Sequence, residues 1–370
     1  MFHVLLFVAG LGALVLGANL LVRGAGKLAL SFGISPLVVG LTIVAFGTSA
    51  PEVAVSAGAV LNGQGDMAIG NVVGSNIFNV LFILGVSALI APLVVNSQLI
   101  RQEVPIMLGA SLLLVALALD GRFGPAEGLL LLVLLVGYTV FLVVQSRRES
   151  QATAQEYADE NPSAQPGDWD SRLPVQLVLI AAGLAALVFG SDWLVTAAIH
   201  FARAMGVSEL VIGLTIVAAG TSMPEVATSI TAAIKGERDI AVGNVVGSNT
   251  FNILGCLGLS GVLSAWGPTG QALAVAPALL AFDLWVMLAV ALACLPVFLT
   301  GREIARWEGG VFLVYYAAYV TYLILAAQQH DALPAFSGVM LGFVVPLTVV
   351  TLVVSLIRHP APKPPGASGS

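Results

Sequence analysis

The stretch "GTSAPE" at residues 47–52 lies inside a long apolar run, and "GTSMPE" at residues 220–225 lies inside another. A proline within a helix removes one backbone hydrogen bond and clashes with the preceding turn. A carboxylate at membrane depth costs about 2.5 kcal/mol or more. A sequence that places both features twice in its most apolar regions predicts a functional site built on broken helices.

The composition is that of a membrane protein. Of the 370 residues, 58% are hydrophobic and 9% are charged, whereas a soluble domain has about 25% charged residues. Apolar runs of about 20 residues recur along the chain, as expected for membrane-spanning helices. The first run lacks a basic start and a clear cleavage site, so we interpret it as a span rather than a signal peptide. We expect eleven spans, at about residues 2–22, 36–60, 68–91, 103–119, 125–144, 174–196, 209–234, 241–264, 280–299, 307–327 and 335–357.

The basic residues predict the orientation of the chain in the membrane. All fourteen Lys and Arg fall between or outside these apolar segments, and alternating connections divide them twelve to two. Basic residues gather on the cytoplasmic side of membrane proteins. The side with few basic residues holds only Arg122 and Arg203. The N-terminus is therefore predicted to lie outside and the C-terminus in the cytoplasm.

An internal duplication organises the chain. Residues 34–85 align with residues 207–258 at an offset of 173, without a gap and with 33 identities in 52 positions. We call these segments the first copy and the second copy. Five expected spans separate them, so they should cross the membrane in opposite directions, as in secondary transporters.

The duplication predicts an all-α polytopic membrane protein with two inverted five-helix repeats (5+5) and an eleventh C-terminal helix. The predicted divisions are a first repeat 1–145, a cytoplasmic linker 146–172, a second repeat 173–328, an extra span 335–357 and a disordered tail 358–370. The linker is acidic and rich in Pro, Ser and Gln, which favours flexibility. A calcium-sensing role for it is a weaker alternative, because its acidic residues lack the spacing of a calcium loop.

The motif of the first copy offers only oxygen ligands. Pro51 has no N–H, so the carbonyl of Gly47 loses its helical partner at membrane depth. Glu52 follows one turn after Thr48 and is expected on the same helical face. Carbonyl, hydroxyl and carboxylate oxygens are the ligands of hard cations such as Ca²⁺ or Na⁺.

A second motif, "GNVVGSNIFN" at residues 70–79, adds two oxygen donors. Ser75 and Asn79 lie one helical turn apart, while Gly70 and Gly74 allow close helix approach. The second copy supplies the equivalent donors Thr221, Ser222, Glu225, Ser248 and Asn252. Kinking and inter-helix hydrogen bonding could account for the Pro, Ser, Thr and Asn residues alone. The two glutamates favour a cation site, because no Lys, Arg or His lies inside any expected span to neutralise them.

Other notable residues have simpler interpretations. Glu103 and Asp283 are expected to mark the starts of the fourth and ninth spans, and Cys256 and Cys294 are expected to be small packing residues. Asp192 falls just inside the sixth span, where a hydrogen bond is a better interpretation than ion binding.

At these two motifs the sequence resembles the cation/calcium exchanger superfamily, the Na⁺/Ca²⁺ exchangers and their prokaryotic relatives. The resemblance implies that spans 2, 3, 7 and 8 hold the ions while spans 1 and 6 slide across them. It implies cation ligands at Thr48, Ser49, Glu52, Ser75 and Asn79, at Thr221, Ser222, Glu225, Ser248 and Asn252, and at backbone oxygens near Ala45 and Ala218. Some prokaryotic relatives have an aspartate where this chain has Asn252, so this site has two acids rather than three.

The resemblance implies an antiporter of the prokaryotic inner membrane, not an enzyme, that exchanges Ca²⁺ for Na⁺. It implies no cofactor beyond the transported ions and no nucleic-acid partner. H⁺ or K⁺ remain alternative coupling ions. A cation channel is disfavoured because channel pores repeat one motif around an axis normal to the membrane. An intramembrane hydrolase is disfavoured because Ser49 has no histidine or lysine inside the spans to activate it.

Overall fold

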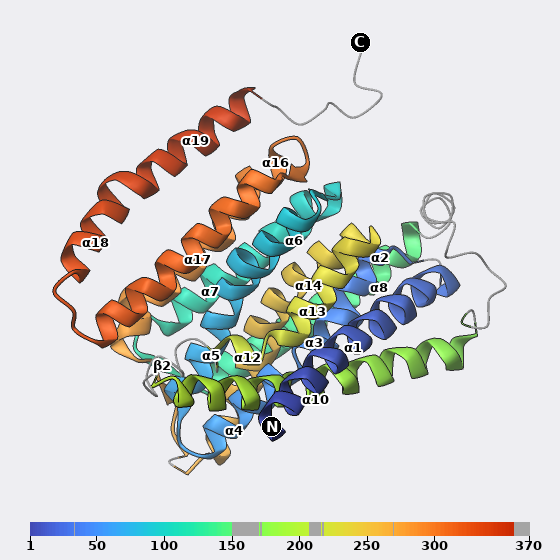
Figure 1. Ribbon diagram of the computed structural model, residues 1–370, viewed down its shortest axis with the longest axis horizontal. Coiled ribbons are helices and arrows are strands. Elements are labelled where there is room, and N and C mark those ends of the chain that lie inside the picture. Colours follow the sequence, from blue (N-terminus) through green and yellow to red (C-terminus); the bar gives the residue numbers. More distant parts are fainter. Residues whose placement is uncertain are drawn as a thin grey trace.

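The computed structural model describes residues 1–32, 34–149, 170, 172–206, 216, 218–268 and 270–358. This part of the chain is helical, with four two-residue strands (Figure 1). The α-helices are α1 (Phe2–Phe32), α2 (Pro36–Val39), α3 (Ala45–Thr48), α4 (Ala50–Leu61), α5 (Gly65–Phe78), α6 (Gly85–Ile90), α7 (Val104–Ala118), α8 (Pro125–Glu149), α10 (Leu173–Ala204), α12 (Ala218–Gly220), α13 (Met223–Lys235), α14 (Arg238–Phe251), α15 (Gly258–Leu263), α16 (Leu284–Leu299), α17 (Arg306–Ala327), α18 (Leu333–Val339) and α19 (Val345–Arg358). Short η segments continue several of them, namely η1 (Gly40–Val44), η2 (Asn79–Leu84), η3 (Leu99–Glu103), η7 (Asn252–Leu257), η8 (Ser264–Trp266), η9 (Leu279–Asp283) and η10 (Met340–Val344).

Within the described residues, nine helices are long and apolar enough to cross a membrane. A tenth span forms if the bent pair Pro36–Thr48 and Ala50–Leu61 is counted as one. The expectation of a polytopic membrane protein is therefore confirmed. The expected span 209–234 lies partly outside the described residues, as do almost all of the predicted linker 146–172 and tail 358–370.

Two helices, α1 and α10, are longer than the apolar runs from which they were predicted. α1 has 31 residues and α10 has 32, or about 46–48 Å at 1.5 Å per residue, against a hydrocarbon core of about 30 Å. The expected first span ended at residue 22, whereas the helix continues to Phe32 and includes Arg23 and Lys27. A helix longer than the bilayer can carry charges at its end, where long basic side chains reach water.

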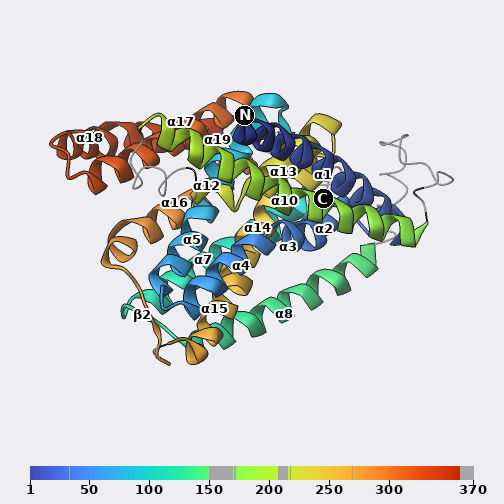
Figure 2. The ribbon, with the colours of Figure 1, turned by 60° about the horizontal axis from the view of Figure 1, so that its bottom comes forward.

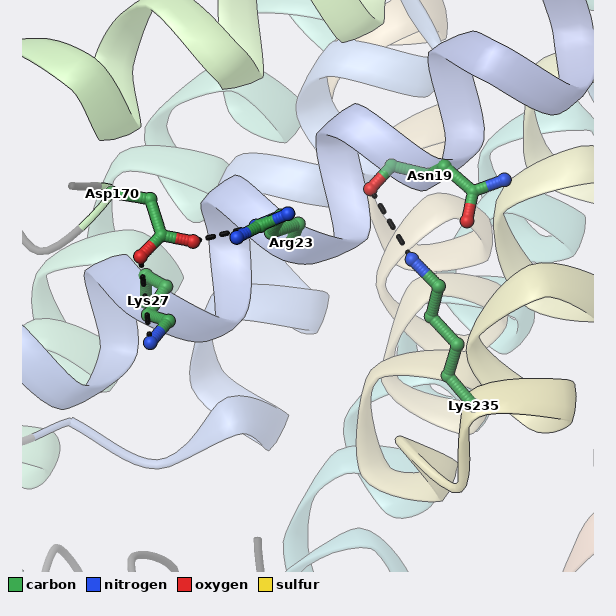
Figure 3. Close-up of polar contacts among 5 residues, drawn as sticks. All are labelled: Asn19, Arg23, Lys27, Asp170 and Lys235. Atoms are coloured by element: carbon green, nitrogen blue, oxygen red, sulfur yellow. Dashed lines mark hydrogen bonds and ion pairs between the residues drawn. The ribbon is translucent and has the colours of Figure 1, made fainter. Parts of the chain in front are cut away.

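The basic end of α1 binds the segment that precedes α10. Arg23 Nε donates a 2.5 Å hydrogen bond to Asp170 Oδ2, and Lys27 Nζ lies 3.5 Å from Asp170 Oδ1 (Figure 3). Burial opposes ionisation of Asp170, but the Arg23 hydrogen bond and the nearby cations outweigh it and lower the pKa of this carboxyl. Close by, Lys235 Nζ lies 3.4 Å from the carbonyl oxygen of Asn19 and donates to it.

α1 and α10 pack against each other (Figure 2), and glycines of both helices lie where they meet. A Cβ atom added at Gly17 would lie 2.8 Å from the Gly183 carbonyl oxygen, and one at Gly183 would lie 2.7 Å from the Leu21 nitrogen. Contacts this short leave no room for a side chain, so glycine permits the close backbone approach. The two helices form one tightly packed pair.

Two short β-ladders join the halves of the chain at their connections. β1 (Leu93–Val94) pairs antiparallel with β4 (Glu303–Ile304), and β2 (Arg122–Phe123) pairs with β3 (Leu273–Ala274). In each ladder, one strand comes from a connection before residue 150 and the other from a connection after residue 264. The halves therefore contact each other through their loops as well as their helices.

The most enclosed helices are those that carry the repeated motifs. The run Arg238–Trp266 is the most buried of the long apolar helices in the described chain, and Gly65–Ile90 follows it. By contrast, α17, α18 and α19 lie at one side of the molecule with little buried surface (Figure 1). A 2.6 Å hydrogen bond from the Tyr315 hydroxyl to Thr348 Oγ1 links α17 to α19.

Candidate cation-binding site

Both predicted helix breaks are present. In the first copy, α3 ends at Thr48, Ser49 has φ −80° and ψ 7°, and α4 starts at Ala50 with a bend of 43°. In the second copy, Ser222 has φ −89° and ψ 10° before α13 starts at Met223. Each motif proline lies in the first turn of the helix that follows, where its missing N–H is tolerated.

The break separates two residues that were expected to lie together. Thr48 and Glu52 were expected on one face of a single helix. They lie on separate helices, with Thr48 at the end of α3 and Glu52 in the first turn of α4. The chain turns at Ser49, so helical periodicity does not carry across the motif.

Each glutamate is hydrogen-bonded by the serine of the other copy. Ser49 Oγ lies 2.9 Å from Glu225 Oε1, and Ser222 Oγ lies 2.8 Å from Glu52 Oε1. All four side chains are fully buried. The two motifs therefore meet in the interior and form one polar cluster to which both copies contribute.

Several oxygens of this cluster have no hydrogen-bond partner within the described structure. They are Glu52 Oε2, Glu225 Oε2, Ser75 Oγ, Ser248 Oγ and Asn79 Oδ1, all buried. A buried oxygen without a partner is costly, and a native protein keeps one where something else satisfies it. A set of carboxylate, hydroxyl and amide oxygens fits a hard cation.

No cationic side chain neutralises the glutamates within the described residues, where the ion pairs found join Arg23 and Lys27 to Asp170. Nor do three His, Cys, Asp or Glu side chains gather there as in a transition-metal site. Two buried carboxylates with only neutral oxygens around them therefore fit one divalent or a few monovalent hard cations.

Four asparagines link the copies where α5 and α14 meet. Asn76 Nδ2 and Asn249 Nδ2 each donate to the other residue's backbone carbonyl at 3.2 Å. Asn79 Nδ2 donates to Asn249 Oδ1 at 2.9 Å, and Asn252 Nδ2 donates to Asn76 Oδ1 at 3.2 Å. The sequence prediction included Asn79 and Asn252 and missed the other two, although both copies carry them in the shared "GSN".

A further polar chain supports the threonine of the first copy. Thr48 Oγ1 donates to the Val44 carbonyl at 3.0 Å and lies 3.2 Å from Asn244 Oδ1. Asn244 Nδ2 in turn donates to Ser229 Oγ at 2.9 Å. Asn244 was not predicted, although it is the second residue of the "GNVVGSN" motif.

The second copy repeats this chain with weaker burial. Thr221 Oγ1 lies 3.4 Å from Asn71 Oδ1, and Asn71 Nδ2 donates to Ser56 Oγ at 3.1 Å. Thr48 and Asn244 are fully buried, whereas Thr221 and Asn71 are partly exposed. The same residues thus lie in a closed environment on one side and a more open one on the other.

The glycines next to Asn244 and Asn71 also differ in how closely the described residues pack against them. A Cβ added at Gly247 would lie 2.7 Å from the Leu41 carbonyl oxygen, and one at Gly243 would lie 3.1 Å from Leu37. At the equivalent Gly70 and Gly74, a Cβ would meet none of the described residues within 4 Å. α14 is therefore packed closely against the first copy, whereas most of the segment 207–217, which corresponds to the first-copy residues that pack there, lies outside the described residues.

The remaining predicted residues lie as follows. The Ala45 carbonyl accepts the Ser49 N–H at 3.1 Å, and Ala218 begins α12. Cys256 is buried, and its thiol lies 3.6 Å from Asn252 Oδ1, so it contacts the cluster as well as filling space. Asp192 is exposed on α10, away from the cluster.

Glu103 and Asp283 directly precede α7 and α16, as expected, but each also lies inside a longer helical run. Glu103 is fully buried four residues into the run that starts at Leu99, and it accepts a 2.7 Å hydrogen bond from the Tyr138 hydroxyl. Asp283 occupies an equivalent place and accepts a 2.8 Å hydrogen bond from the Tyr319 hydroxyl. These acids are satisfied by tyrosines, which explains why burial is tolerated there.

Comparison with known proteins gives consistent results. The family model described as sodium/calcium exchanger protein matches residues 2–144 and 175–325. Inner membrane protein YrbG of Escherichia coli is 40% identical over 60% of this chain and 68% of its own length. The sodium/calcium exchanger MaX1 of Methanosarcina acetivorans is 34% identical over 76% of this chain and 87% of its own. The solved structure of a sodium/calcium exchanger from Methanococcus jannaschii superposes with a TM-score of 0.72 and 29% identity, covering 86% of this chain and 97% of that one.

Proposed function

The chain belongs to the sodium/calcium exchanger protein family, and we propose that it is a secondary active antiporter that exchanges Ca²⁺ for Na⁺ by alternating access. The family is one of exchangers rather than enzymes. The observation that carries the proposal is the reciprocal pairing of Ser49 with Glu225 and Ser222 with Glu52, which leaves one oxygen of each carboxylate buried without a partner among the described residues.

The proposed ligands are the oxygens that converge on this cluster from both copies. Glu52 and Glu225 supply the charge. The neutral ligands are Thr48, Ser49, Ser75, Asn79, Thr221, Ser222, Ser248 and Asn252, with backbone oxygens near Ala45 and Ala218. This assignment is supported by the burial of all these side chains except Thr221 and by oxygens without a partner among the described residues, on both glutamates and on Ser75, Asn79 and Ser248.

Charge balance supports one shared site for both ions. Two carboxylates supply a formal charge of −2, which one Ca²⁺ neutralises. A second divalent ion would leave the membrane interior strongly positive, which is costly at low dielectric. Bound Ca²⁺ therefore excludes a full load of Na⁺, and this exclusion couples the two fluxes.

An inverted 5+5 arrangement is supported by how the connections pair. Counting spans from an outside N-terminus assigns the connections that hold β1 and β4 to the cytoplasmic side, and those that hold β2 and β3 to the outside. The strands pair in these two combinations. The basic residues Arg23, Lys27 and Lys235, all assigned to the cytoplasm, also lie near one another (Figure 3).

The unequal burial of the two copies supports alternating access. Asn244 is fully buried and its neighbouring glycines are closed against the first copy, whereas the equivalent Asn71 is partly exposed. If Asn71 became enclosed and Asn244 became exposed, access to the cation site would move from the outer side to the cytoplasmic side. The glycine-packed pair of α1 and α10 is a rigid unit suited to make that movement.

Calcium uptake into proteoliposomes, with Na⁺, K⁺ or pH gradients imposed one at a time, tests the proposal. We expect uptake to follow an outward Na⁺ gradient and to stop when Na⁺ is equal on both sides. Uptake that follows the pH gradient alone would replace Na⁺ by H⁺. Uptake without any gradient dependence would contradict an antiporter.

A further inference from the structure

Asn76 and Asn249 form the centre of the four-asparagine cluster, yet neither is among the proposed ligands. Both side chains are buried, with 2% and 3% of their surfaces exposed. Each uses its Nδ2 on the backbone carbonyl of the other, at 3.2 Å. Their contacts therefore tie α5 to α14 at the place where the two motif helices meet.

These backbone contacts determine which way each carboxamide points. A backbone carbonyl only accepts hydrogen bonds, so the atom that faces it must be the amide nitrogen. The oxygens of Asn76 and Asn249 are then directed at their other neighbours, Asn252 and Asn79. Asn252 and Asn79 must therefore face these oxygens with their amide nitrogens. The distances from Nδ2 to Oδ1, 3.2 Å for Asn252 and 2.9 Å for Asn79, are those of hydrogen bonds.

The consequence reaches the proposed cation ligands. With both nitrogens engaged, Asn79 and Asn252 turn their Oδ1 atoms away from the asparagine contacts. Asn79 Oδ1 is buried and has no partner in the described structure. A free, directed amide oxygen is a ligand for a hard cation, whereas an amide nitrogen would repel one.

We propose that Asn76 and Asn249 are positioning residues, which hold the carboxamides of Asn252 and Asn79 with their oxygens presented to the transported cation. The inference rests on the proposed function, because it names a role within the same site. The same contacts specify a neutral donor at both central positions, since Asn76 Oδ1 and Asn249 Oδ1 accept from them. A charged aspartate at either position would place a carboxylate oxygen next to the Oδ1 of Asn249 or Asn76, with no hydrogen between the two acceptors.

The two halves of the cluster are not equivalent. Asn252 Oδ1 has the Cys256 thiol at 3.6 Å, whereas the residue at the matching place of the first copy, Ile83, offers no donor to Asn79. A thiol is a weak donor, so it occupies Asn252 Oδ1 only in part. Asn79 should therefore be the stronger ligand, and Asn249, which positions it, should matter more than Asn76.

A double-mutant cycle separates positioning from general packing. The variants are Asn249→Leu, Asn79→Ala and the double variant, with equilibrium ⁴⁵Ca²⁺ binding to purified protein as the measurement. Thr250→Val is the matched control, because Thr250 is equally buried on α14 and, among the described contacts, bonds only the Val246 carbonyl of its own helix. Partners that orient a metal ligand are worth about 10–100-fold in affinity.

We expect Asn249→Leu to weaken Ca²⁺ binding about tenfold, Asn79→Ala to weaken it at least as much, and the double variant to bind no worse than Asn79→Ala. Independent, multiplying losses would overturn the positioning role, as would wild-type affinity in Asn249→Leu. If Asn249→Leu cannot be purified, the mirror cycle of Asn76→Leu and Asn252→Ala tests the same coupling. Absence of Ca²⁺ binding in the wild type would instead contradict the proposed function.

Discussion

Ser49 of the first copy donates a 2.9 Å hydrogen bond to Glu225 of the second, across 176 residues of sequence. Ser222 and Glu52 make the mirror contact at 2.8 Å. Neither copy completes the carboxylate environment alone, because each supplies the acid that the other stabilises. The duplication is thus required by the site itself and not only by the fold.

Replacing either glutamate by glutamine should abolish exchange. The amide keeps the shape of the side chain but removes half of the formal charge of the site. A unit charge at 4 Å is worth about 4 kcal/mol at an effective dielectric of about 20, so Ca²⁺ affinity should fall by about 100-fold or more. Gradient-driven ⁴⁵Ca²⁺ uptake by Glu52→Gln and Glu225→Gln proteoliposomes measures this.

Glu103→Gln provides the control, since Glu103 is an equally buried acid that bonds Tyr138 outside the cluster. It should retain most of the flux. Wild-type flux in either Glu52→Gln or Glu225→Gln would refute the assigned site, and equal loss in all three variants would indicate a general effect of removing buried acids.

Removing the serine hydroxyls should have a milder and symmetric effect. Ser49→Ala and Ser222→Ala each remove one hydrogen bond to a carboxylate, a contact worth about 1.5–3 kcal/mol. The carboxylates themselves remain, so we expect roughly tenfold weaker Ca²⁺ binding in each variant. Calorimetric titration of both proteins measures this, and a large loss in only one of them would contradict the reciprocal arrangement.

The broken helices, the two acids and most of the oxygen donors could be predicted from the sequence. Proline, glycine and a carboxylate in an apolar run have local consequences that need no knowledge of the fold. The internal repeat then indicated that these features meet. The end of the first apolar run was a poor guide to the end of α1, because the helix continues beyond residue 22 through Arg23 and Lys27.

The pairing inside the site could not be predicted in the same way. Which serine bonds which glutamate depends on how two segments 170 residues apart approach each other. Asn76 and Asn249 look like inter-helix contacts in the sequence, and only their carbonyl contacts reveal that they orient other side chains. The partner of Glu103 could not be predicted either, because Tyr138 comes from another helix.

Na⁺ should displace Ca²⁺ from the purified protein. Both ions are proposed to share Glu52 and Glu225, whose combined charge one Ca²⁺ neutralises. Raising Na⁺ should therefore lower the apparent Ca²⁺ affinity in equilibrium binding, and choline at equal ionic strength should not. Ca²⁺ binding that is indifferent to Na⁺ would rule out a shared site.

The α1–α10 contact should tolerate no side chain at Gly17. A Cβ there would lie 2.8 Å from the Gly183 carbonyl oxygen and 2.9 Å from the Leu187 nitrogen. Overpacking of this kind costs about 1–3 kcal/mol, so Gly17→Ala should lower the thermal unfolding midpoint. Gly12→Ala is the matched control on the same helix, since a Cβ at Gly12 meets none of the described residues within 4 Å. Equal midpoints for the two variants would contradict the close packing.

The contact of Asp170 with Arg23 and Lys27 should stabilise the protein in a pH-dependent way. The pKa of Asp170 is lowered in the folded state, with the cations outweighing the effect of burial. Its contribution is therefore present above the unfolded-state pKa of about 3.9 and is lost as the pH falls through the lower folded-state value. Because the Arg23 side chain is 46% exposed, the contribution should be about 1 kcal/mol or less.

Asp170→Asn should then unfold at a slightly lower temperature than the wild type at pH 7, and the difference should shrink as the pH falls below about 4. Asp66→Asn, at an exposed acid that bonds only its neighbour's N–H among the described contacts, should show no such difference at either pH. A gap between Asp170→Asn and wild type that is independent of pH would mean that Asp170 acts through packing and not through its charge.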